Sequence, residues 1–390
     1  MNVFVYGYYG FGNAGDELLL RRVIEYFKAR ASNVKFIVRC HDESQTGFEN
    51  EPVEFVNLDA SLSQPNDSKL IGFIRYISTG ARLIKNSQAF VFGGGTLFQS
   101  SGRIPYTLIL ITTLCILAWV HKVPVYALGV GVGQLKDGLS KQLFKLILRL
   151  VSDFAVRDVT SMTNANFVSQ SPKLRLTSDL VFGATAVLGK RELKSGPPES
   201  LKHIGLTLAA SDSKLTGENL QNLSEQLTSL ILEMREKQPS CKISCLTFQN
   251  FETVTGVRLS DKHMLERLVS EDLLRDVDFC PMPNNIEDAM KLVSSFDVIM
   301  GMRFHGLVLA AMAQVPFIGI SRDHKAIDLC KRFDFPSWNV TQVLGVPLFD
   351  LVIKALKTKV DTNTLDSCQR LSDANFDEIE KNINRCKGRY

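Results

Sequence analysis

The sequence predicts an α/β protein of two lobes, each built on a parallel sheet with helices on both faces. Short apolar runs alternate with amphipathic helical stretches along most of the chain, as in strand–helix–strand units. The chain has 390 residues, more than one hydrophobic core usually organises. A polar stretch with glycine and two prolines interrupts the alternation near the middle, and the pattern then begins again. Such sheets bind ligands at the carboxyl ends of their strands, so we expect the active site in the cleft between the lobes.

The elements follow from this alternation. In the first lobe, the expected strands are Val3–Tyr6, Val34–Val38, Ala89–Phe92, Val123–Leu128 and Phe154–Val156, and the expected helices are Asp16–Ala29, Leu70–Ile84, Tyr106–His121 and Lys141–Leu150. In the second lobe, the expected strands are His203–Leu208, Lys242–Phe248, Val277–Phe279, Val298–Met300 and Pro316–Ile320, and the expected helices are Glu218–Lys237, Asp261–Val269, Ile286–Ser294, His305–Met312 and Lys325–Arg332. The boundaries that follow are a first lobe at 1–188, a linker at 189–201, a second lobe at 202–365 and a polar helical tail at 366–390.

Composition narrows the class of protein. Apolar residues make up 45% of the chain and charged residues 22%, which is ordinary for a globular protein. The net charge of +4 is spread along the chain, so no clustered basic face indicates nucleic-acid binding. A small basic surplus suits anionic substrates or an anionic membrane surface.

The eight cysteines are scattered and predict free thiols in a reducing compartment. Cys241 and Cys245 are close together, but no second pair or nearby histidine completes a zinc site, so we expect no bound metal. The chain begins as a strand, without the basic region of a signal peptide. The longest apolar run, residues 107–120, is shorter than the roughly 20 residues of a membrane-spanning helix. These features predict a cytoplasmic protein.

A glycine-rich loop follows the first strand and opens the first helix. Its sequence, Tyr-Gly-Tyr-Tyr-Gly-Phe-Gly-Asn-Ala-Gly-Asp-Glu over residues 6–17, lets the backbone turn sharply and approach a ligand closely. Amides at a helix start favour anions, yet Asp16 and Glu17 already complement that positive end. The loop matches neither the dinucleotide-binding nor the P-loop motif. Either Asp16 only caps the helix, or the loop contacts a ligand.

Two further strand ends of the first lobe carry candidate residues. Gly-Gly-Gly-Thr-Leu-Phe-Gln at 93–99 removes the side chains between backbone and ligand, and a tight packing turn is the alternative. Arg157 follows the strand that ends at Val156, and its planar guanidinium suits carboxylate or phosphate. The alternative for Arg157 is a salt bridge to Asp158 or Asp179.

The second lobe places cations at two strand ends. Gly-Met-Arg-Phe-His-Gly at 301–306 spaces Arg303 and His305 two apart, so that both point the same way on extended backbone. A permanent cation beside an imidazole can bind an oxyanion and move a proton, although His305 could instead cap the helix. Ile-Ser-Arg-Asp-His-Lys at 320–325 adds Lys325, with a solvated turn as the alternative. Together these stretches predict a transferase that handles an anionic, phosphate-bearing donor.

In this order, the motifs resemble the polysaccharide pyruvyl transferase family over residues 3 to about 330. The opening glycine loop and Met-Arg-Phe-His-Gly are specific, and Gly-Gly-Gly-Thr-Leu-Phe-Gln and Val-Arg-Asp add to them. The resemblance implies two Rossmann-like lobes of the glycosyltransferase-B type. It also implies transfer of pyruvate from phosphoenolpyruvate to two hydroxyls of one sugar, forming a cyclic ketal during polysaccharide biosynthesis. The family has a cell-wall branch, which the opening motif resembles most, and an exopolysaccharide branch.

The resemblance further implies roles for single residues. Arg303 and His305 would be catalytic, with His305 as the general acid, either at the methylene or at the departing phosphate. The donor site would comprise Arg157, Arg303, His305 and Lys325. The acceptor side would comprise Asn13, Asp16, Glu17, Gly94, Gly95 and Gln99, with Asp16 or Glu17 able to accept a hydroxyl proton. The reaction would need no cofactor and no metal, because phosphoenolpyruvate is itself the donor substrate.

Two other functions stay open. A nucleotide-sugar-dependent glycosyltransferase of the same fold would also use a cation of the second lobe, for a diphosphate. A non-enzymatic binder of sugars or anions would not need both Arg303 and His305.

The expected partners are phosphoenolpyruvate and a saccharide acceptor, free or lipid-linked, and not nucleic acid. The apolar Tyr106–Val120 and the basic Lys136–Arg149 could contact the inner face of the cytoplasmic membrane, where a lipid-linked acceptor is held. A buried helix followed by an amphipathic helix is the alternative.

Overall fold

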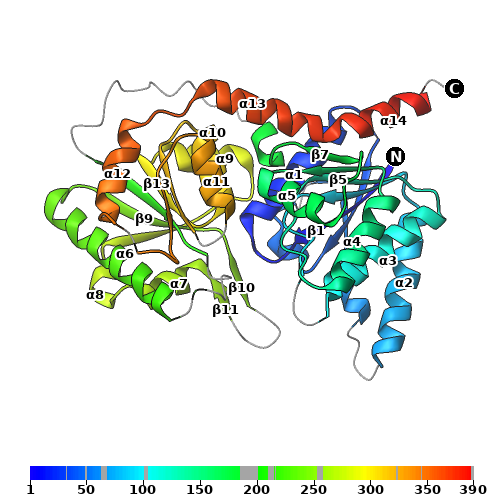
Figure 1. Ribbon diagram of the computed structural model, residues 1–390, viewed down its shortest axis with the longest axis horizontal. Helices are drawn as coiled ribbons and strands as arrows, with labels where there is room; N and C mark the ends of the chain where they lie inside the picture. The colour runs from blue at the N-terminus through cyan, green and yellow to red at the C-terminus, as the bar shows by residue number, and fades with distance from the viewer. Residues whose placement is uncertain are drawn as a thin grey trace. The chain divides into compact units, whose positions relative to one another are not determined.

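The computed structural model divides the chain into two compact units (Figure 1). Unit 1 contains Met1–Phe11, Asp16–Gly183 and Cys368–Tyr390, and unit 2 contains Gly12–Gly15 and Ala184–Ser367. The expected linker at 189–201 lies outside the described residues, except for the buried Leu201. The described residues are 1–31, 33–48, 51–62, 68–100, 104–184, 201–209, 215, 217–252, 258–321, 324–343 and 345–387.

Unit 1 is built on a seven-stranded parallel sheet in the order β3-β2-β1-β4-β5-β6-β7. All residues of β4 and β5 are buried, because both faces of the sheet are covered. This burial explains why the central strands are continuous apolar runs. The strands are β1 (Asn2–Tyr9), β2 (Lys35–Cys40), β3 (Val53–Val56), β4 (Ala89–Gly93), β5 (Val125–Val130), β6 (Asp153–Val156) and β7 (Leu174–Leu176).

The helices α2, α3 and α4 of unit 1 lie side by side on one face of this sheet (Figure 1). The side chains of Ser68, Asp137 and Asp158 cap α2, α4 and α5. The elements expected in the first lobe are all present. The pattern does not predict β3, β7 and α5, because both strands are short and only partly buried and α5 has no apolar stripe. The helices are α1 (Ala14–Lys28), α2 (Lys69–Lys85), α3 (Tyr106–Val120), α4 (Gly138–Leu150) and α5 (Val159–Val168), with short 3₁₀ helices at Glu43–Gln45, Asp59–Leu62 and Leu180–Gly183.

Unit 2 has a six-stranded parallel sheet in the order β12-β9-β8-β13-β14-β15 and a two-stranded antiparallel sheet, β10-β11. The expected strands and helices are again present, and the short β10, β11, β15 and α8 and the ten-residue α12 are additional. The strands are β8 (His203–Thr207), β9 (Lys242–Thr247), β10 (Asn250–Glu252), β11 (Arg258–Ser260), β12 (Val277–Pro281), β13 (Val298–Gly301), β14 (Phe317–Ser321) and β15 (Ser337–Asn339). The helices are α6 (Glu218–Lys237), α7 (Asp261–Leu268), α8 (Glu271–Leu274), α9 (Ile286–Ser294), α10 (Phe304–Met312), α11 (His324–Arg332) and α12 (Leu348–Lys357).

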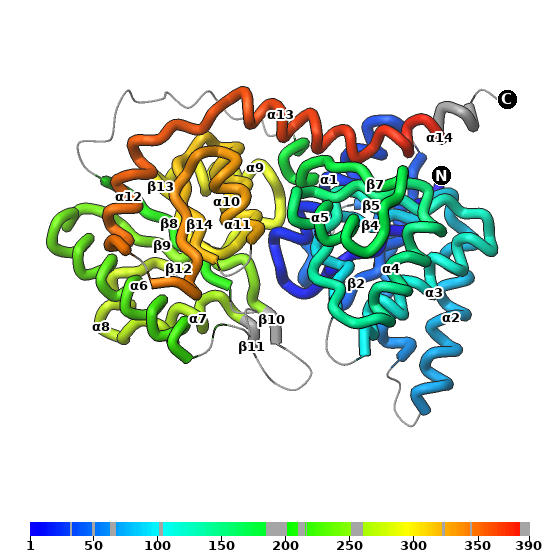
Figure 2. Tube along the Cα trace, in the orientation of Figure 1, coloured from blue at the N-terminus to red at the C-terminus, as the bar shows by residue number. Residues whose placement is uncertain are grey.

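The C-terminal tail is helical, as expected, and its last part belongs to unit 1. It consists of α13 (Thr362–Asp373), a 3₁₀ turn at Ala374–Phe376 and α14 (Asp377–Lys387). The buried Asn375 accepts a hydrogen bond from the Thr177 hydroxyl at 2.8 Å and donates one to the Ser178 carbonyl at 2.9 Å. Figure 2 shows the red end of the trace returning to the unit that also contains the blue N-terminus. Unit 1 therefore contains residues from both ends of the chain.

Among the described residues, no helix combines the length and the apolar character needed to cross a bilayer.

Candidate functional site

Arg303 follows β13 at the carboxyl edge of the unit 2 sheet and is held by a buried carboxylate. Its Nε donates to Asp261 Oδ2 at 3.0 Å and to the Leu208 carbonyl at 3.1 Å. Its Nη2 donates to Gln249 Oε1 at 3.0 Å and forms an ion pair with Asp261 Oδ1. Asp261 is fully buried, and its Oδ2 also accepts the backbone N–H groups of Phe248 and Gln249. The guanidinium is therefore fixed along its Nε–Nη2 edge.

The other edge of the Arg303 guanidinium is available to a ligand. No acceptor for Nη1 is found in the described part of the chain, and 11% of the side chain is exposed. An oriented, permanently charged fork of this kind matches the geometry of a carboxylate or phosphate. Unit 2 therefore presents a guanidinium of fixed orientation that is suited to an anion, and its expected contact with the donor stays a prediction.

His305 lies in the first turn of α10, two residues after Arg303, and the N-terminal glycine loop packs against it. A Cβ atom on Gly15 would lie 2.2 Å from His305 Nδ1, so the close approach of the imidazole requires glycine there. The Ala14 N–H donates to the Phe248 carbonyl at 2.9 Å, and Asn13 pairs with Gln249 in a short antiparallel bridge. Residues 12–15 thus belong to the same unit as Arg303 and His305, although they lie in the first-lobe part of the sequence.

Lys325 is the second residue of α11, which follows β14. Because β13 and β14 are parallel neighbours, Lys325 and Arg303 both follow strand ends at the carboxyl edge of the same sheet. The Lys325 side chain is half-buried. Arg322 and Asp323 of this stretch lie outside the described residues.

Arg157 lies in unit 1 and forms the salt bridge that was the alternative to a ligand role. Its Nη1 donates to Oδ2 of the buried Asp179 at 2.9 Å, and its Nη2 donates to the Thr96 hydroxyl at 3.2 Å. Its Nε lies 3.6 Å from Asp158 Oδ2. The buried guanidinium therefore joins the loops that follow β4 and β6. This arrangement fixes Arg157 in place and leaves its expected contact with the donor a prediction.

The triple-glycine turn after β4 packs closely on the first turns of α1. A Cβ atom on Gly94 would lie 2.9 Å from the Leu19 side chain, and one on Gly95 would lie 3.3 Å from Asp16 Oδ1. The tight packing turn considered for this motif is thus present at Gly94. Gly95 instead faces the carboxylate of Asp16, and Gln99 is exposed.

Glu17 is fully buried beneath the glycine loop. Its Oε1 accepts the Gly10 N–H at 2.8 Å, and no partner for its Oε2 is found among the described residues. Burial raises the pKa of Glu17 to about 8, and the nearby Asp16 carboxylate adds to the rise. Burial likewise raises the pKa of the Tyr9 hydroxyl, which donates to the Gly93 carbonyl. Glu17 is therefore protonated near neutral pH, and its hydrogen bond with the Gly10 N–H holds the glycine loop in place.

Replacing Glu17 by Gln is expected to flatten the pH dependence of stability. The unfolded chain loses this proton near the ordinary value of 4.5, whereas the folded chain keeps it until about pH 8. The contribution of Glu17 to the free energy of unfolding is therefore largest below pH 4.5, and it falls by about 1.4 kcal/mol per pH unit between pH 4.5 and pH 8. Urea unfolding across this window should show the slope in the parent and not in Glu17→Gln. The exposed Glu225→Gln is the control, and equal slopes in all three proteins would contradict the assignment.

Three buried polar residues that form hydrogen bonds with Arg303 or Arg157 are not predicted by the sequence as parts of a site. Asp261 follows Ser260 in a polar Ser-Asp-Lys-His stretch, which has the composition of an ordinary helix start. Gln249 precedes a short hairpin that the sequence pattern does not predict. Asp179 was considered only as a partner of Arg157. The roles of Asp261 and Gln249 depend on contacts with Arg303, 42 and 54 residues away in the sequence.

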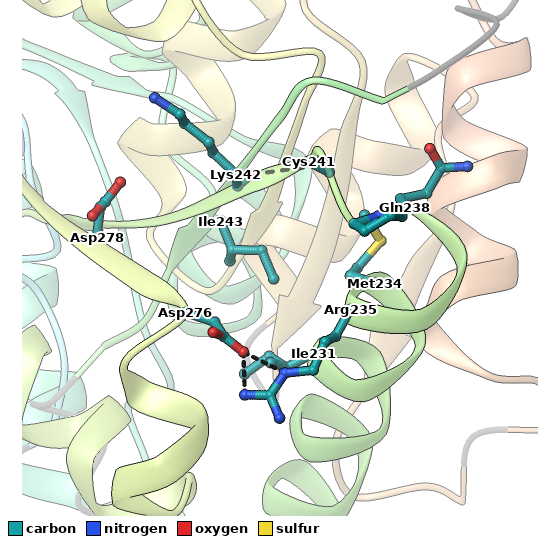
Figure 3. A pocket seen from close by; sticks show the side chains of 10 residues that line it. Ile231, Met234, Arg235, Gln238, Cys241, Lys242, Ile243, Asp276 and Asp278 are labelled. Carbon is teal, nitrogen blue, oxygen red and sulfur yellow. Dashed lines mark hydrogen bonds and ion pairs between the residues drawn. The ribbon is translucent and has the colours of Figure 1, made fainter.

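Among the described residues, neither a cluster of metal-ligating side chains nor a pocket of unit 2 indicates a second site in that unit. The described residues contain no group of three or more His, Cys, Asp or Glu side chains able to hold a metal ion. A pocket of about 250 Å³ lies where β9 and β12 begin, and Figure 3 shows Arg235 paired with Asp276 at its wall. This pocket is at the amino edge of the unit 2 sheet, whereas Arg303 follows a strand at the carboxyl edge.

Solved structures with the same fold include several enzymes of nucleotide sugars. The UDP-GlcNAc 2-epimerase from Neisseria meningitidis bound to UDP-GlcNAc is 14% identical, with 98% of this chain and 100% of that chain covered and a TM-score of 0.63. The UDP-GlcNAc 2-epimerase from Methanocaldococcus jannaschii is 12% identical, with 96% and 99% covered and a TM-score of 0.59. HepE from Anabaena in complex with UDP is 12% identical, with 100% and 99% covered and a TM-score of 0.54. These likenesses confirm two Rossmann-like lobes of the glycosyltransferase-B type.

Sequence comparison identifies the family. No curated protein sequence matches this chain. The family model described as polysaccharide pyruvyl transferase matches residues 13–324, which include the Asn13 end of the glycine loop, Arg157, Arg303 and His305. This chain belongs to the polysaccharide pyruvyl transferase family.

Proposed function

We propose that this protein transfers the pyruvyl group of phosphoenolpyruvate to two hydroxyls of one sugar and releases phosphate. The observation that carries the proposal is the Arg303–His305 pair, in which Asp261 orients the guanidinium and an imidazole stands two residues away. Membership of the family supports a pyruvyl transferase that acts on a polysaccharide or its precursor. The donor has a carboxylate and a phosphate, which are the groups that an oriented arginine binds best.

During the reaction, one proton is added to the donor and two protons are removed from the sugar hydroxyls. A proton adds to the methylene carbon of phosphoenolpyruvate, which becomes the methyl group, and the neighbouring carbon becomes an oxocarbenium-like electrophile. One sugar hydroxyl adds to that carbon, the carbon–oxygen bond to phosphate breaks, and the second hydroxyl closes the ring. Of the two hydroxyl protons, one replaces the proton given to the methylene and one leaves with phosphate. We assign the proton transfer to the methylene to His305.

The remaining residues take supporting roles in this proposal. Arg303 and Lys325 stabilise the anionic groups of the donor, and Arg157 joins the donor set as a guanidinium that Asp179 holds in place. The acceptor side comprises Asn13, Asp16, Glu17, Gly94, Gly95 and Gln99. Within that set, the burial of Glu17 favours support of the loop, which leaves Asp16 as the better candidate to accept a hydroxyl proton.

The proposed setting is the synthesis of a cell-wall or exported polysaccharide in the cytoplasm. The acceptor is a saccharide, either free or attached to a lipid carrier. The donor is a substrate, so the proposed reaction uses no cofactor and no metal ion.

A nucleotide-sugar-dependent glycosyltransferase is the second candidate. The specific observation in its favour is that solved structures of the same fold are bound to UDP-GlcNAc or UDP. Fold alone does not set the donor, however, and this candidate gives His305 no defined task.

Ligand-dependent thermal unfolding distinguishes the two candidates. A ligand that binds only the folded protein raises its midpoint in proportion to the logarithm of its concentration. We expect phosphoenolpyruvate to raise the midpoint of the parent and not that of Arg303→Ala, and we expect UDP-GlcNAc to raise neither. Stabilisation by UDP-GlcNAc without stabilisation by phosphoenolpyruvate would favour the glycosyltransferase.

A further inference from the structure

An exposed apolar cluster lies at the start of α2 and α3 in unit 1. Its side chains are 48% to 68% exposed, although they are large and apolar: Leu70, Ile71, Ile74, Ile104 and Tyr106. Single exposed apolar residues are common on protein surfaces, but neighbouring ones indicate an interaction site. The cluster is therefore a candidate docking surface.

Helix packing places the two halves of the cluster at the same level. Gly80 of α2 packs against Leu114 and Leu117 of α3. Both helices lead into neighbouring parallel strands, β4 and β5, so they run in the same direction. Moving ten residues back from Gly80 along α2, about 15 Å at 1.5 Å per residue, reaches Leu70, and moving eight back from Leu114, about 12 Å, reaches Tyr106, the first residue of α3. Ile104 comes just before α3. The five side chains thus gather at the carboxyl edge of the unit 1 sheet.

Positive charge is concentrated in the part of the chain that forms α2, α3 and α4, which corrects the expectation of an even spread. Residues 68–152 contain ten Lys and Arg but one acidic residue, Asp137, and so carry +9, whereas the rest of the chain carries −5 to give the total of +4. These residues include α2, α3 and α4, which lie side by side (Figure 1). Among the exposed basic side chains, Lys69 and Lys136 lie at the starts of α2 and α4, near the cluster. The others follow the helices to their far ends, at the amino edge of the sheet: Arg82, Lys85, Lys122 and Arg149.

We propose that the starts of α2 and α3 dock this protein on a bilayer surface that contains anionic phospholipid. Exposed aliphatic side chains and a tyrosine at the same helix starts as Lys69 and Lys136 match the two layers of such a surface, the acyl boundary and the anionic headgroups. The near absence of acidic residues over three helices favours a partner with uniform negative charge over a protein surface of mixed charge. Leu70, Ile71 and Ile74 enter the acyl boundary, and Lys69 and Lys136 contact the headgroups.

Docking goes beyond the proposed function, because it needs neither donor nor acceptor. It places the carboxyl edge of the unit 1 sheet, where the triple-glycine turn follows β4, near the bilayer. An acceptor attached to a lipid carrier would then reach this edge without leaving the membrane.

Co-sedimentation with vesicles tests the proposal on the full chain. We expect binding to vesicles of phosphatidylcholine with phosphatidylglycerol, weaker binding at high salt, and little binding to pure phosphatidylcholine. The triple variant Leu70→Ser/Ile71→Ser/Ile74→Ser should lose at least about tenfold in partition, since each buried CH₂ contributes about 0.8 kcal/mol. The matched control is Leu232→Ser/Val343→Ser, which removes exposed apolar side chains of unit 2 and should bind as the parent does.

Three results would overturn the proposal. They are equal binding by the parent and the triple variant, equal binding to both vesicle types, and no vesicle binding by the parent. If light scattering shows self-association that the triple variant abolishes, without vesicle binding, the surface contacts protein instead. Because all three replaced side chains are exposed, the triple variant should keep the thermal midpoint of the parent, which shows that any loss of binding is local.

Discussion

Replacing His305 by Gln is expected to lower kcat for pyruvyl transfer by about 10²- to 10⁴-fold, the usual contribution of a general acid. The physical reason is that glutamine cannot give a proton to the methylene carbon of phosphoenolpyruvate. Donor binding should change little, because Asp261 holds Arg303 independently of His305. Steady-state phosphate release and the thermal midpoint with phosphoenolpyruvate measure the two effects separately.

The control for this prediction is His263→Gln, an exposed histidine on α7 that pairs with Glu266. It should keep the parent rate. A His305→Gln protein with the parent rate would remove His305 from the reaction. A loss confined to KM would assign His305 to donor binding.

Replacing Asp261 by Asn is expected to lower kcat/KM by at least about 10²-fold, because the partly buried Arg303 then lacks its counter-charge and its orientation. The same change should destabilise unit 2 by about 3 kcal/mol or more, since one partner of a buried ion pair is left behind. Most of the kinetic loss should appear as a raised KM for phosphoenolpyruvate. Initial rates and urea unfolding measure the two effects.

A double-mutant cycle separates a positioning role of Asp261 from simple instability. If Asp261 acts through Arg303, Asp261→Asn should have a much smaller effect on kcat/KM in an Arg303→Ala background than in the parent. Additive effects would show that the two residues act independently. Asp288→Asn, at the exposed start of α9, is the control and should leave the rate unchanged.

The elements of the fold could be predicted because their apolar patterns are local. Parallel strands that are buried on both faces are continuous apolar runs, and β4 and β5 show this pattern. The position of Arg303 and His305 after β13 also follows from the sequence, because a strand end is a local feature. The short β7 and β10 could not be predicted, since three residues carry too little periodicity.

The contacts that define the candidate site could not be predicted, because they join distant parts of the chain. Asp261 reaches Arg303 across 42 positions, and nothing in its own surroundings marks it as buried. Residues 12–15 follow the first strand, yet Ala14 and Asn13 pair with the segment at Phe248–Gln249. The burial of Glu17 could likewise not be predicted from the sequence, because a glutamate in the first turn of a helix is usually exposed.

Pyruvyl transfer from phosphoenolpyruvate is tested most directly by measuring phosphate and ketal product in the same reaction. The protein is incubated with phosphoenolpyruvate and a panel of lipid-linked and free oligosaccharides, and the released phosphate is compared with the acid-labile ketal formed. The proposed function predicts one phosphate released for each cyclic pyruvate ketal on the acceptor, and turnover that is about 10²- to 10³-fold slower with the Arg303→Ala protein. Transfer of a sugar from a nucleotide donor to the same acceptors, without consumption of phosphoenolpyruvate, would contradict it.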